Sequence, residues 1–142
     1  MSCAVEFSAP YSDWYQLEIR NTQGMTWTGT AVHAITGTTV HIGSYTLPAG
    51  TKGISAGQYG FVEYYLTYTC PSLPYTSVVF GVPTTSIFGG GLGSLANAFE
   101  YGNCVGNAGF ESHRTLLGGV EVSVGFQTRG LAGLALIFPC RY

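Results

Sequence analysis

A long stretch without charge constrains this chain more than any other feature. Between Tyr64 and Phe99 the sequence contains no Asp, Glu, Lys, Arg or His. The stretch includes the apolar run "SVVFGV" (77–82), then Pro83 and a glycine-rich segment. A membrane-spanning helix needs about 18 to 20 consecutive apolar residues, and no run in this sequence is that long. We therefore expect short buried strands that are joined by Gly and Pro turns.

The overall composition favours one small domain with few charges. The chain has 142 residues, and we expect a single core and a single domain over residues 1–142. Charged residues make up 8% of the sequence, the net charge is −2, and the 5 Lys and Arg residues are scattered singly. Nucleic acid is not an expected partner, because binding to a duplex needs a basic patch. A low net charge also favours self-association, so a homo-oligomer stays open.

The clearest strand pattern covers residues 14–21. Leu17 and Ile19 alternate there with Glu18 and Arg20. Alternation with a period of two is typical of a strand that buries one face. We therefore expect Leu17 and Ile19 to face the core.

Other short strands are expected along the rest of the chain. A Gly-Thr turn at 37–38 and the connection "QTRG" (127–130) each predict a hairpin. Ser94 is a candidate N-cap for one short helix over 93–102. The expected strands are 30–36, 39–47, 60–69, 75–82, 119–126 and 131–138. Many short strands between Gly and Pro turns predict an all-β fold, either a sandwich or a barrel.

The cysteines leave two interpretations open. Cys3, Cys70, Cys104 and Cys140 stand far apart, and no C-x-x-C spacing indicates a zinc site. All of them could be buried free thiols. Alternatively, two disulfides could form, with Cys3 bonded to Cys140 and Cys70 bonded to Cys104. The sequence alone does not choose between these interpretations.

Catalytic patterns are not found in the sequence. The imidazoles are those of His33, His41 and His113, and Asp13 is the only Asp. His33 and His41 lie on neighbouring predicted strands, but two histidines without a carboxylate make a poor metal site. The segment "GGGLGS" lacks the Lys of a phosphate-binding loop. We therefore expect a protein that is not an enzyme and that needs no metal or cofactor.

Several short segments, in order along the chain, resemble the actinoporins, the pore-forming toxins of sea anemones. Asn21, Gly24 and then Thr26-Trp27-Thr28 stand before a predicted strand, as in that family. The segments "YGFVEYYLTY", "SVVFGVP", "FEYGN" and "LLGGVEVSVGFQTRGLAGLALIF" are similar to later parts of those toxins. The resemblance covers residues 21–138, and the fungal fruit-body lectins share the same sandwich. It implies an antiparallel β-sandwich of about ten strands with one or two short helices.

The same resemblance implies a binding surface. Actinoporins hold a phosphocholine head group in a pocket of Ser, Val, Pro and Tyr residues, and they insert exposed Trp side chains into the bilayer interface. Val62, Pro83 and Tyr101 match pocket positions, while Phe88 and Leu92 stand in place of the membrane Trp residues. The candidate site residues for a lipid or glycan are thus Val62, Tyr64, Tyr75, Pro83, Phe88, Leu92, Phe99 and Tyr101.

Two expectations remain open for the segment "TTSIFGGGLG" (84–93). Its apolar side chains could form an exposed loop tip that contacts a membrane, a sugar or a protein. Alternatively, Phe88 and Leu92 could pack into the end of the sandwich.

The N-terminal segment departs from the actinoporin pattern. About a dozen residues precede the first predicted strand and would give roughly 18 Å of helix, which is short of a bilayer core of about 30 Å. We therefore do not expect the pore-lining helix of that family. The segment also lacks a basic start and an apolar centre, so no secretory signal is expected. The location stays open between the cytosol and secretion after processing, with action at target membranes.

Three functions are compatible with these observations. The first is a membrane-binding protein that recognises lipid head groups or cell-surface glycans, and that forms pores only if another element supplies the pore wall. The second is a lectin that forms no pores. The third is a self-assembling structural protein, which free strand edges and low charge would favour.

Overall fold

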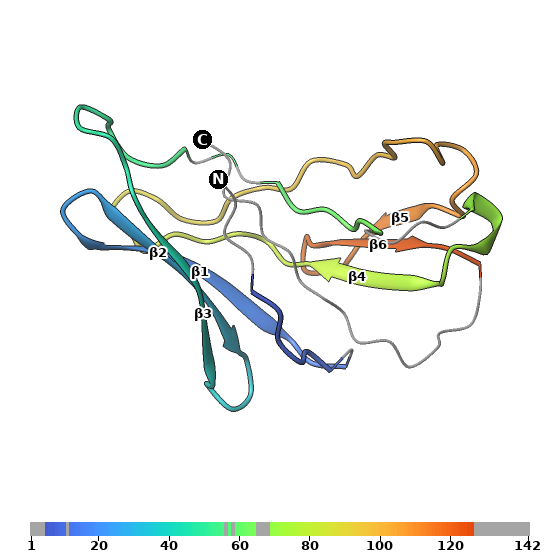
Figure 1. Cartoon of the computed structure of the whole chain (residues 1–142), viewed down its shortest axis with the longest axis horizontal. Helices are drawn as coiled ribbons and strands as arrows, with labels where there is room; N and C mark the ends of the chain where they lie inside the picture. Colours follow the sequence, from blue (N-terminus) through green and yellow to red (C-terminus); the bar gives the residue numbers. More distant parts are fainter. Residues whose placement is uncertain (1–4, 11, 56, 58, 65–68, 127–142) are drawn as a thin grey trace. The chain divides into compact units, whose positions relative to one another are not determined.

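The protein consists almost entirely of β-structure. The computed structural model describes residues 5–10, 12–55, 57, 59–64 and 69–126, and these contain six strands and one short 3-10 turn (Figure 1). The strands form two antiparallel sheets of three strands each. The described residues divide into two compact units, one up to Gly57 and the other from Tyr59 onward. The predicted all-β class is confirmed, whereas the single domain over 1–142 stays a prediction.

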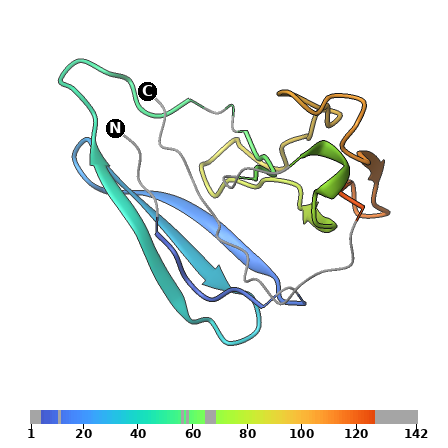
Figure 2. The same cartoon turned by 45° about the vertical axis from the view of Figure 1, so that its right-hand side comes forward.

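The first unit contains a three-stranded meander. Its strands are β1 (Tyr15–Gln23), β2 (Thr26–His33) and β3 (Thr39–Thr46), paired in the order β1-β2-β3 (Figure 2). The turn between β2 and β3 contains Gly37 with a φ of 70°, a conformation that glycine adopts without strain. The predicted strands at 14–21 and 39–47 and the hairpin between β2 and β3 are therefore confirmed, and β2 begins at Thr26, earlier than expected.

The expectation that Leu17 and Ile19 face a core is wrong. Both side chains are half exposed, at 50% each, whereas Ala31, which pairs with Leu17 across the ladder, is buried. The reason is the strand order. Because β2 is the central strand, Ala31 has neighbours on both sides, while β1 lies at an edge of the sheet and its side chains have neighbours on one side only.

The second unit holds the second sheet, in the order β4-β6-β5. Its strands are β4 (Thr76–Phe80), β5 (Glu111–Arg114) and β6 (Val120–Val124). Val78 of β4 and Ser112 of β5 both pair with Val122 of β6, so these three side chains lie on one face. Thr76, Val120 and Val122 are buried on that face. The predicted strands at 75–82 and 119–126 are confirmed, and β4 forms an edge of its sheet.

Two sequence predictions fail in the second unit. Segment 93–102 is not helical: the Gly93 N–H donates to the Pro83 carbonyl, and the Leu95 carbonyl accepts from the Arg114 guanidinium. These tertiary partners replace the internal hydrogen bonds of a two-turn helix, which is marginal on its own. Residues 60–64 are not in a strand either, because none of the described strands pairs with them. Residues 65–68 and the predicted strand at 131–138 lie outside the described residues.

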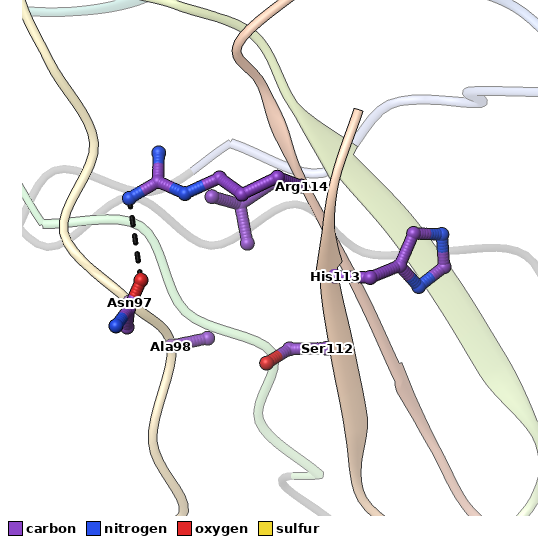
Figure 3. Close-up of a pocket in the computed structure, with 6 residues that line it drawn as sticks. Asn97, Ala98, Ser112, His113 and Arg114 are labelled. Atoms are coloured by element: carbon purple, nitrogen blue, oxygen red, sulfur yellow. Dashed lines mark hydrogen bonds between the residues drawn. The ribbon is translucent and has the colours of Figure 1, made fainter. Parts of the chain in front are cut away.

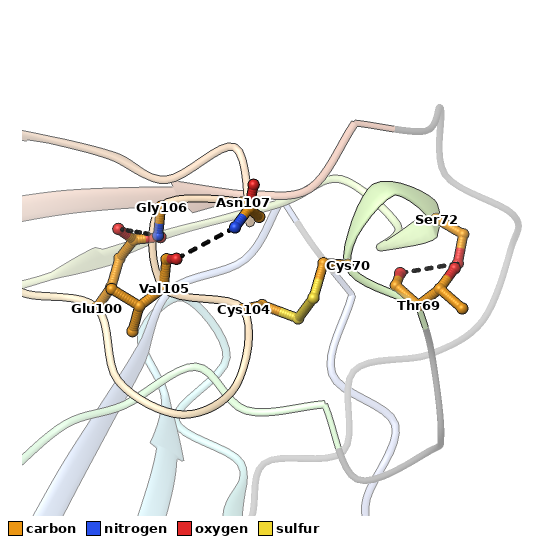
Figure 4. Close-up of a disulfide and its surroundings, with 8 residues drawn as sticks. All are labelled: Thr69, Cys70, Ser72, Glu100, Cys104, Val105, Gly106 and Asn107. Atoms are coloured by element: carbon orange, nitrogen blue, oxygen red, sulfur yellow. Dashed lines mark hydrogen bonds between the residues drawn. A yellow bond between two sulfur atoms is a disulfide. The ribbon is translucent and has the colours of Figure 1, made fainter.

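A disulfide links two loops of the second unit. Cys70, in the 3-10 turn Cys70–Ser72, is bonded to Cys104, and their Cα atoms are 5.4 Å apart (Figure 4). The Glu100 carboxylate accepts a hydrogen bond from the Gly106 N–H at 3.0 Å and closes the loop around Cys104. This pairing confirms one of the two disulfides considered for the sequence, and the free-thiol interpretation is wrong for this pair. Cys3 and Cys140 lie outside the described residues.

Removal of this disulfide should destabilise the protein strongly. The bond closes a loop with a sequence separation of 34 residues, for which the chain-entropy relation gives about 3 to 5 kcal/mol. We expect the double variant Cys70→Ser/Cys104→Ser to lose free energy of unfolding in that range in urea titrations. Reductant should lower the urea midpoint of the wild type more than that of the variant. Equal midpoints for the two proteins would contradict the assignment.

Gly125 stands where the chain leaves β6 and touches another backbone segment. Its φ is 93°, and a Cβ atom there would lie 2.1 Å from the Pro74 carbonyl oxygen. The Gly125 N–H donates to the Ala108 carbonyl at 2.7 Å. Only glycine combines this dihedral angle with so close an approach.

A matched pair of variants separates these two effects. Gly102 has a similar φ of 84°, but a Cβ there would meet nothing within 4 Å. Gly102→Ala should therefore lower the free energy of unfolding only by the strain of that backbone conformation, about 1 to 3 kcal/mol. Gly125→Ala should lose clearly more in the same urea titration, because the new methyl group collides with Pro74. Equal losses would show that the close approach is relieved without cost.

Candidate functional site

Residues 83–93 form a hydrogen-bonded loop, which we call the apolar loop. Thr84 and Leu92 form an isolated antiparallel bridge, and the Gly93 N–H donates to the Pro83 carbonyl at 2.8 Å. Further along, the Gly90 N–H donates to the Ile87 carbonyl at 2.9 Å, and Gly89 has a φ of 78°. The chain thus turns back on itself like a small hairpin, with Ile87 and Phe88 at its tip.

The apolar loop presents its large side chains to solvent. The exposed fractions are 72% for Ile87, 105% for Phe88 and 81% for Leu92. The interpretation in which Phe88 and Leu92 pack into the protein is therefore wrong. Exposed apolar side chains that stand together make this loop a candidate binding surface.

A second exposed apolar tip was not predicted from the sequence. The turn between β5 and β6 exposes Leu116 at 106% and Leu117 at 92%, and the Gly118 N–H donates to the Thr115 carbonyl at 3.0 Å. The turn leaves the sheet at the end where β4 passes into the apolar loop, because Phe80 and Arg114 both pair with Val120. The sequence signal was "LLGG", an apolar pair directly before two glycines.

The other predicted site residues come together only in pairs. Burial of the phenol, and then the negative charge of Glu63, raise the pKa of Tyr101 above 10.0, so Tyr101 lies near the segment that holds Val62. The Tyr64 hydroxyl donates to the Pro74 carbonyl, next to Tyr75.

Exposure differs among these predicted residues. Phe99, Tyr101 and Tyr75 are exposed at 76%, 51% and 43%. Val62 is half-buried, and Pro83 is exposed at the base of the apolar loop. Among the described residues, ring contacts occur in the first unit, between Phe7, Tyr15 and His33, and none joins Phe88, Phe99 and Tyr101 into a stacked cage.

An open pocket lies beside β5. It has a volume of about 410 Å³ and is lined by Asn97, Ala98, Ser112, His113, Arg114 and Val120. Figure 3 shows the side chains of Ser112 and Arg114 on the side that faces Asn97, while the His113 ring points away. The Arg114 guanidinium donates to Asn97 Oδ1 at 3.3 Å. None of these residues was assigned to a binding site from the sequence, because an isolated Arg in the polar segment "ESHR" carries no motif.

A row of polar side chains crosses the opposite face of this sheet. The Ser77 hydroxyl donates to Glu121 Oε1 at 2.9 Å, and His113 Nε2 lies 3.2 Å from Glu121 Oε2. A catalytic triad needs the imidazole between the hydroxyl and the carboxylate. Here the carboxylate stands between the other two groups, so the imidazole does not accept the proton of Ser77. The row is a cross-strand polar network.

The Asp13 carboxylate and His33 form a part-buried pair in the first unit. His33 Nδ1 accepts hydrogen bonds from the Ile35 and Thr36 N–H groups at 3.3 and 3.1 Å. The proton therefore sits on His33 Nε2, which donates to Asp13 Oδ2 at 2.9 Å. Both ring nitrogens are thus occupied, and the pair fixes the turn after β2.

Two further features concern metal binding and membrane-spanning helices. Within the described residues, no group of three or more His, Cys, Asp or Glu side chains is arranged to bind a metal ion. His41 bonds to Ser44 at 3.0 Å and forms no site with His33. In the same part of the chain, no helix combines the length and the apolarity that are needed to span a bilayer.

Comparison with known proteins gives no relative for this chain. No protein-family model, no curated protein and no solved structure matches it. The resemblance to actinoporins therefore stays a prediction.

The Asp13–His33 pair predicts a specific dependence of stability on pH. The hydrogen bond from His33 lowers the pKa of Asp13 below 3.8, so the folded state favours the carboxylate more than the unfolded state does. This contribution is present above about pH 4 and is lost as the pH falls through the lowered pKa. Asp13→Asn should therefore be less stable than wild type at neutral pH in urea titrations. The difference should shrink at acidic pH, and a constant difference would contradict the assignment.

Proposed function

We propose that this protein binds membrane surfaces by inserting the apolar loop into the bilayer interface. The observation that carries the proposal is the complete exposure of Phe88 at the tip of a hydrogen-bonded loop. Burial of one large apolar side chain is worth about 1.5 to 3 kcal/mol. Ile87, Phe88 and Leu92 together therefore supply enough free energy for reversible binding without a spanning helix.

The uncharged stretch supports this proposal. A charged side chain carried into a bilayer is opposed by several kcal/mol, and Tyr64 to Phe99 contains none. The apolar loop lies within this stretch, so its own side chains carry no ionised group into the interface. Leu116 and Leu117 extend the apolar surface from the neighbouring turn.

The same proposal includes the finer fold and the class of protein. We infer an actinoporin-like sandwich of about ten strands in one domain, in which Val62, Pro83, Phe99 and Tyr101 surround the binding surface, supported by Tyr64 and Tyr75. The polar network at Glu121, with its carboxylate in the central position, supports a role without catalysis. The proposed ligand is a lipid head group, and glycan binding and self-assembly are the competing outcomes of the experiment below.

Vesicle co-sedimentation tests the insertion of the apolar loop. We expect Phe88→Ser/Leu92→Ser to bind phosphatidylcholine and sphingomyelin vesicles at least about tenfold more weakly than wild type, since two apolar contacts are lost. Val105→Ser is the control. Val105 is also exposed, at 52%, but lies in the disulfide-bonded loop at the other end of the second sheet.

The outcomes separate the competing functions. If the wild-type protein binds no vesicles but binds glycans on an array, the proposed function is wrong and the protein is a lectin. Assembly that grows with concentration and is unaffected by either ligand would favour a structural protein. Release of a trapped dye, alongside binding, would add pore formation to the proposed function.

A further inference from the structure

A single cation stands in the pocket beside β5. Arg114 is the only Lys or Arg between Lys52 and Arg129. It occupies the last position of β5 and pairs with the buried Val120 of β6. Its position is thus fixed by the sheet, and the apolar turn with Leu116 and Leu117 follows directly.

Hydrogen bonds hold the Arg114 guanidinium in place but do not use all of its N–H donors. Nη2 donates to the Leu95 carbonyl at 2.5 Å and to Asn97 Oδ1 at 3.3 Å. Within the described residues, no acceptor meets Nη1 or Nε. A guanidinium carries five N–H donors, so donors remain for a ligand while the side chain is already oriented.

The pocket around Arg114 suits an anion. Ser112 lies on the same face of β5 and adds a hydroxyl, and the lining contains no carboxylate. The acidic side chains of the sheet, Glu111 and Glu121, belong to the opposite face, where Glu121 contacts His113 and Ser77. Nothing in the lining therefore neutralises the positive charge.

We propose that this pocket binds a phosphate monoester, presented by a lipid head group at the membrane surface. Fixed N–H and O–H donors around one guanidinium are the usual recognition chemistry for phosphate. A volume of about 410 Å³ falls in the range of small-ligand sites and exceeds that of a bare ion. This inference rests on the proposed membrane binding, because Leu116 and Leu117 would bring the pocket opening to the interface.

Two probes test the pocket separately from membrane insertion. The soluble probe is glycerol phosphate, followed by amide NMR shifts of Asn97, Ser112 and Arg114. The membrane probe is a pair of phosphatidylcholine vesicles, with and without phosphatidic acid. We expect wild type to prefer the vesicles with phosphatidic acid, and Arg114→Gln to reduce that preference about tenfold through loss of a charge-assisted hydrogen bond. Binding to vesicles of phosphatidylcholine alone should be unchanged.

A second variant covers the case in which Arg114→Gln disturbs the 95–97 segment. Ser112→Asp keeps Arg114 and its bonds to Leu95 and Asn97 but places a carboxylate in the pocket. It should also abolish the preference for phosphatidic acid, with an unfolding midpoint close to that of wild type. If either folded variant retains the full preference, the phosphate site is wrong.

The two proposals fail in different ways. Suppose that the wild type binds no vesicles, but glycerol phosphate still shifts its amide signals and Arg114→Gln removes those shifts. This result would overturn membrane insertion and the lipid as the source of phosphate. A site for soluble phosphate esters would remain. Vesicle binding without any preference for phosphatidic acid, and without shifts by glycerol phosphate, would overturn the pocket and leave membrane insertion intact.

Discussion

The pairing of β6 with both of its neighbours is the constraint on which the rest of the second unit depends. Val120, at the start of β6, pairs with Phe80 on one side and with Arg114 on the other. The end of β4 and the end of β5 are therefore aligned at one buried residue. Gly119 allows this approach, because a Cβ there would lie 2.7 Å from the Phe80 carbonyl oxygen. A slip of one residue would turn Arg114 to the other face of the sheet. The register of β5 and β6 thus decides on which face of the sheet the Arg114 side chain lies.

The loops of this unit are ordered by local bonds more than by a large core. Among the described residues no bulky side chain is fully buried, and the buried positions are small or β-branched, apart from Leu73. The apolar loop depends on its own hydrogen bonds, and the loop around Cys104 depends on the disulfide and on Glu100. Such an arrangement frees apolar side chains for the surface, since the loops do not need them for burial.

The sequence predicted the regular strands better than the site. Alternation and β-branched residues identified β1, β3, β4 and β6, but β5 was missed because "ESHR" is exposed along its whole length and has no alternation. The helix expected at 93–102 failed because tertiary partners took its backbone groups. The sequence left two interpretations open for Phe88, exposed or buried, because an apolar loop has the same sequence pattern in both cases. Arg114 could not be found, because its pocket is made by residues that are distant in the chain.

The scarcity of charge gives the proposed phosphate site its selectivity. In a surface with many acids and bases, one arginine would pair with a neighbouring carboxylate, and an anionic ligand would have to displace it. Here the sequence around Arg114 offers Glu111 and Glu121, and the alternation of β5 and β6 puts both on the other face of the sheet. A charge interaction also strengthens where the surroundings become less polar, as at a bilayer interface. In the proposed binding mode the apolar tips and the lone guanidinium are therefore complementary, because the tips would bring the opening of the pocket to a medium in which its single charge matters most.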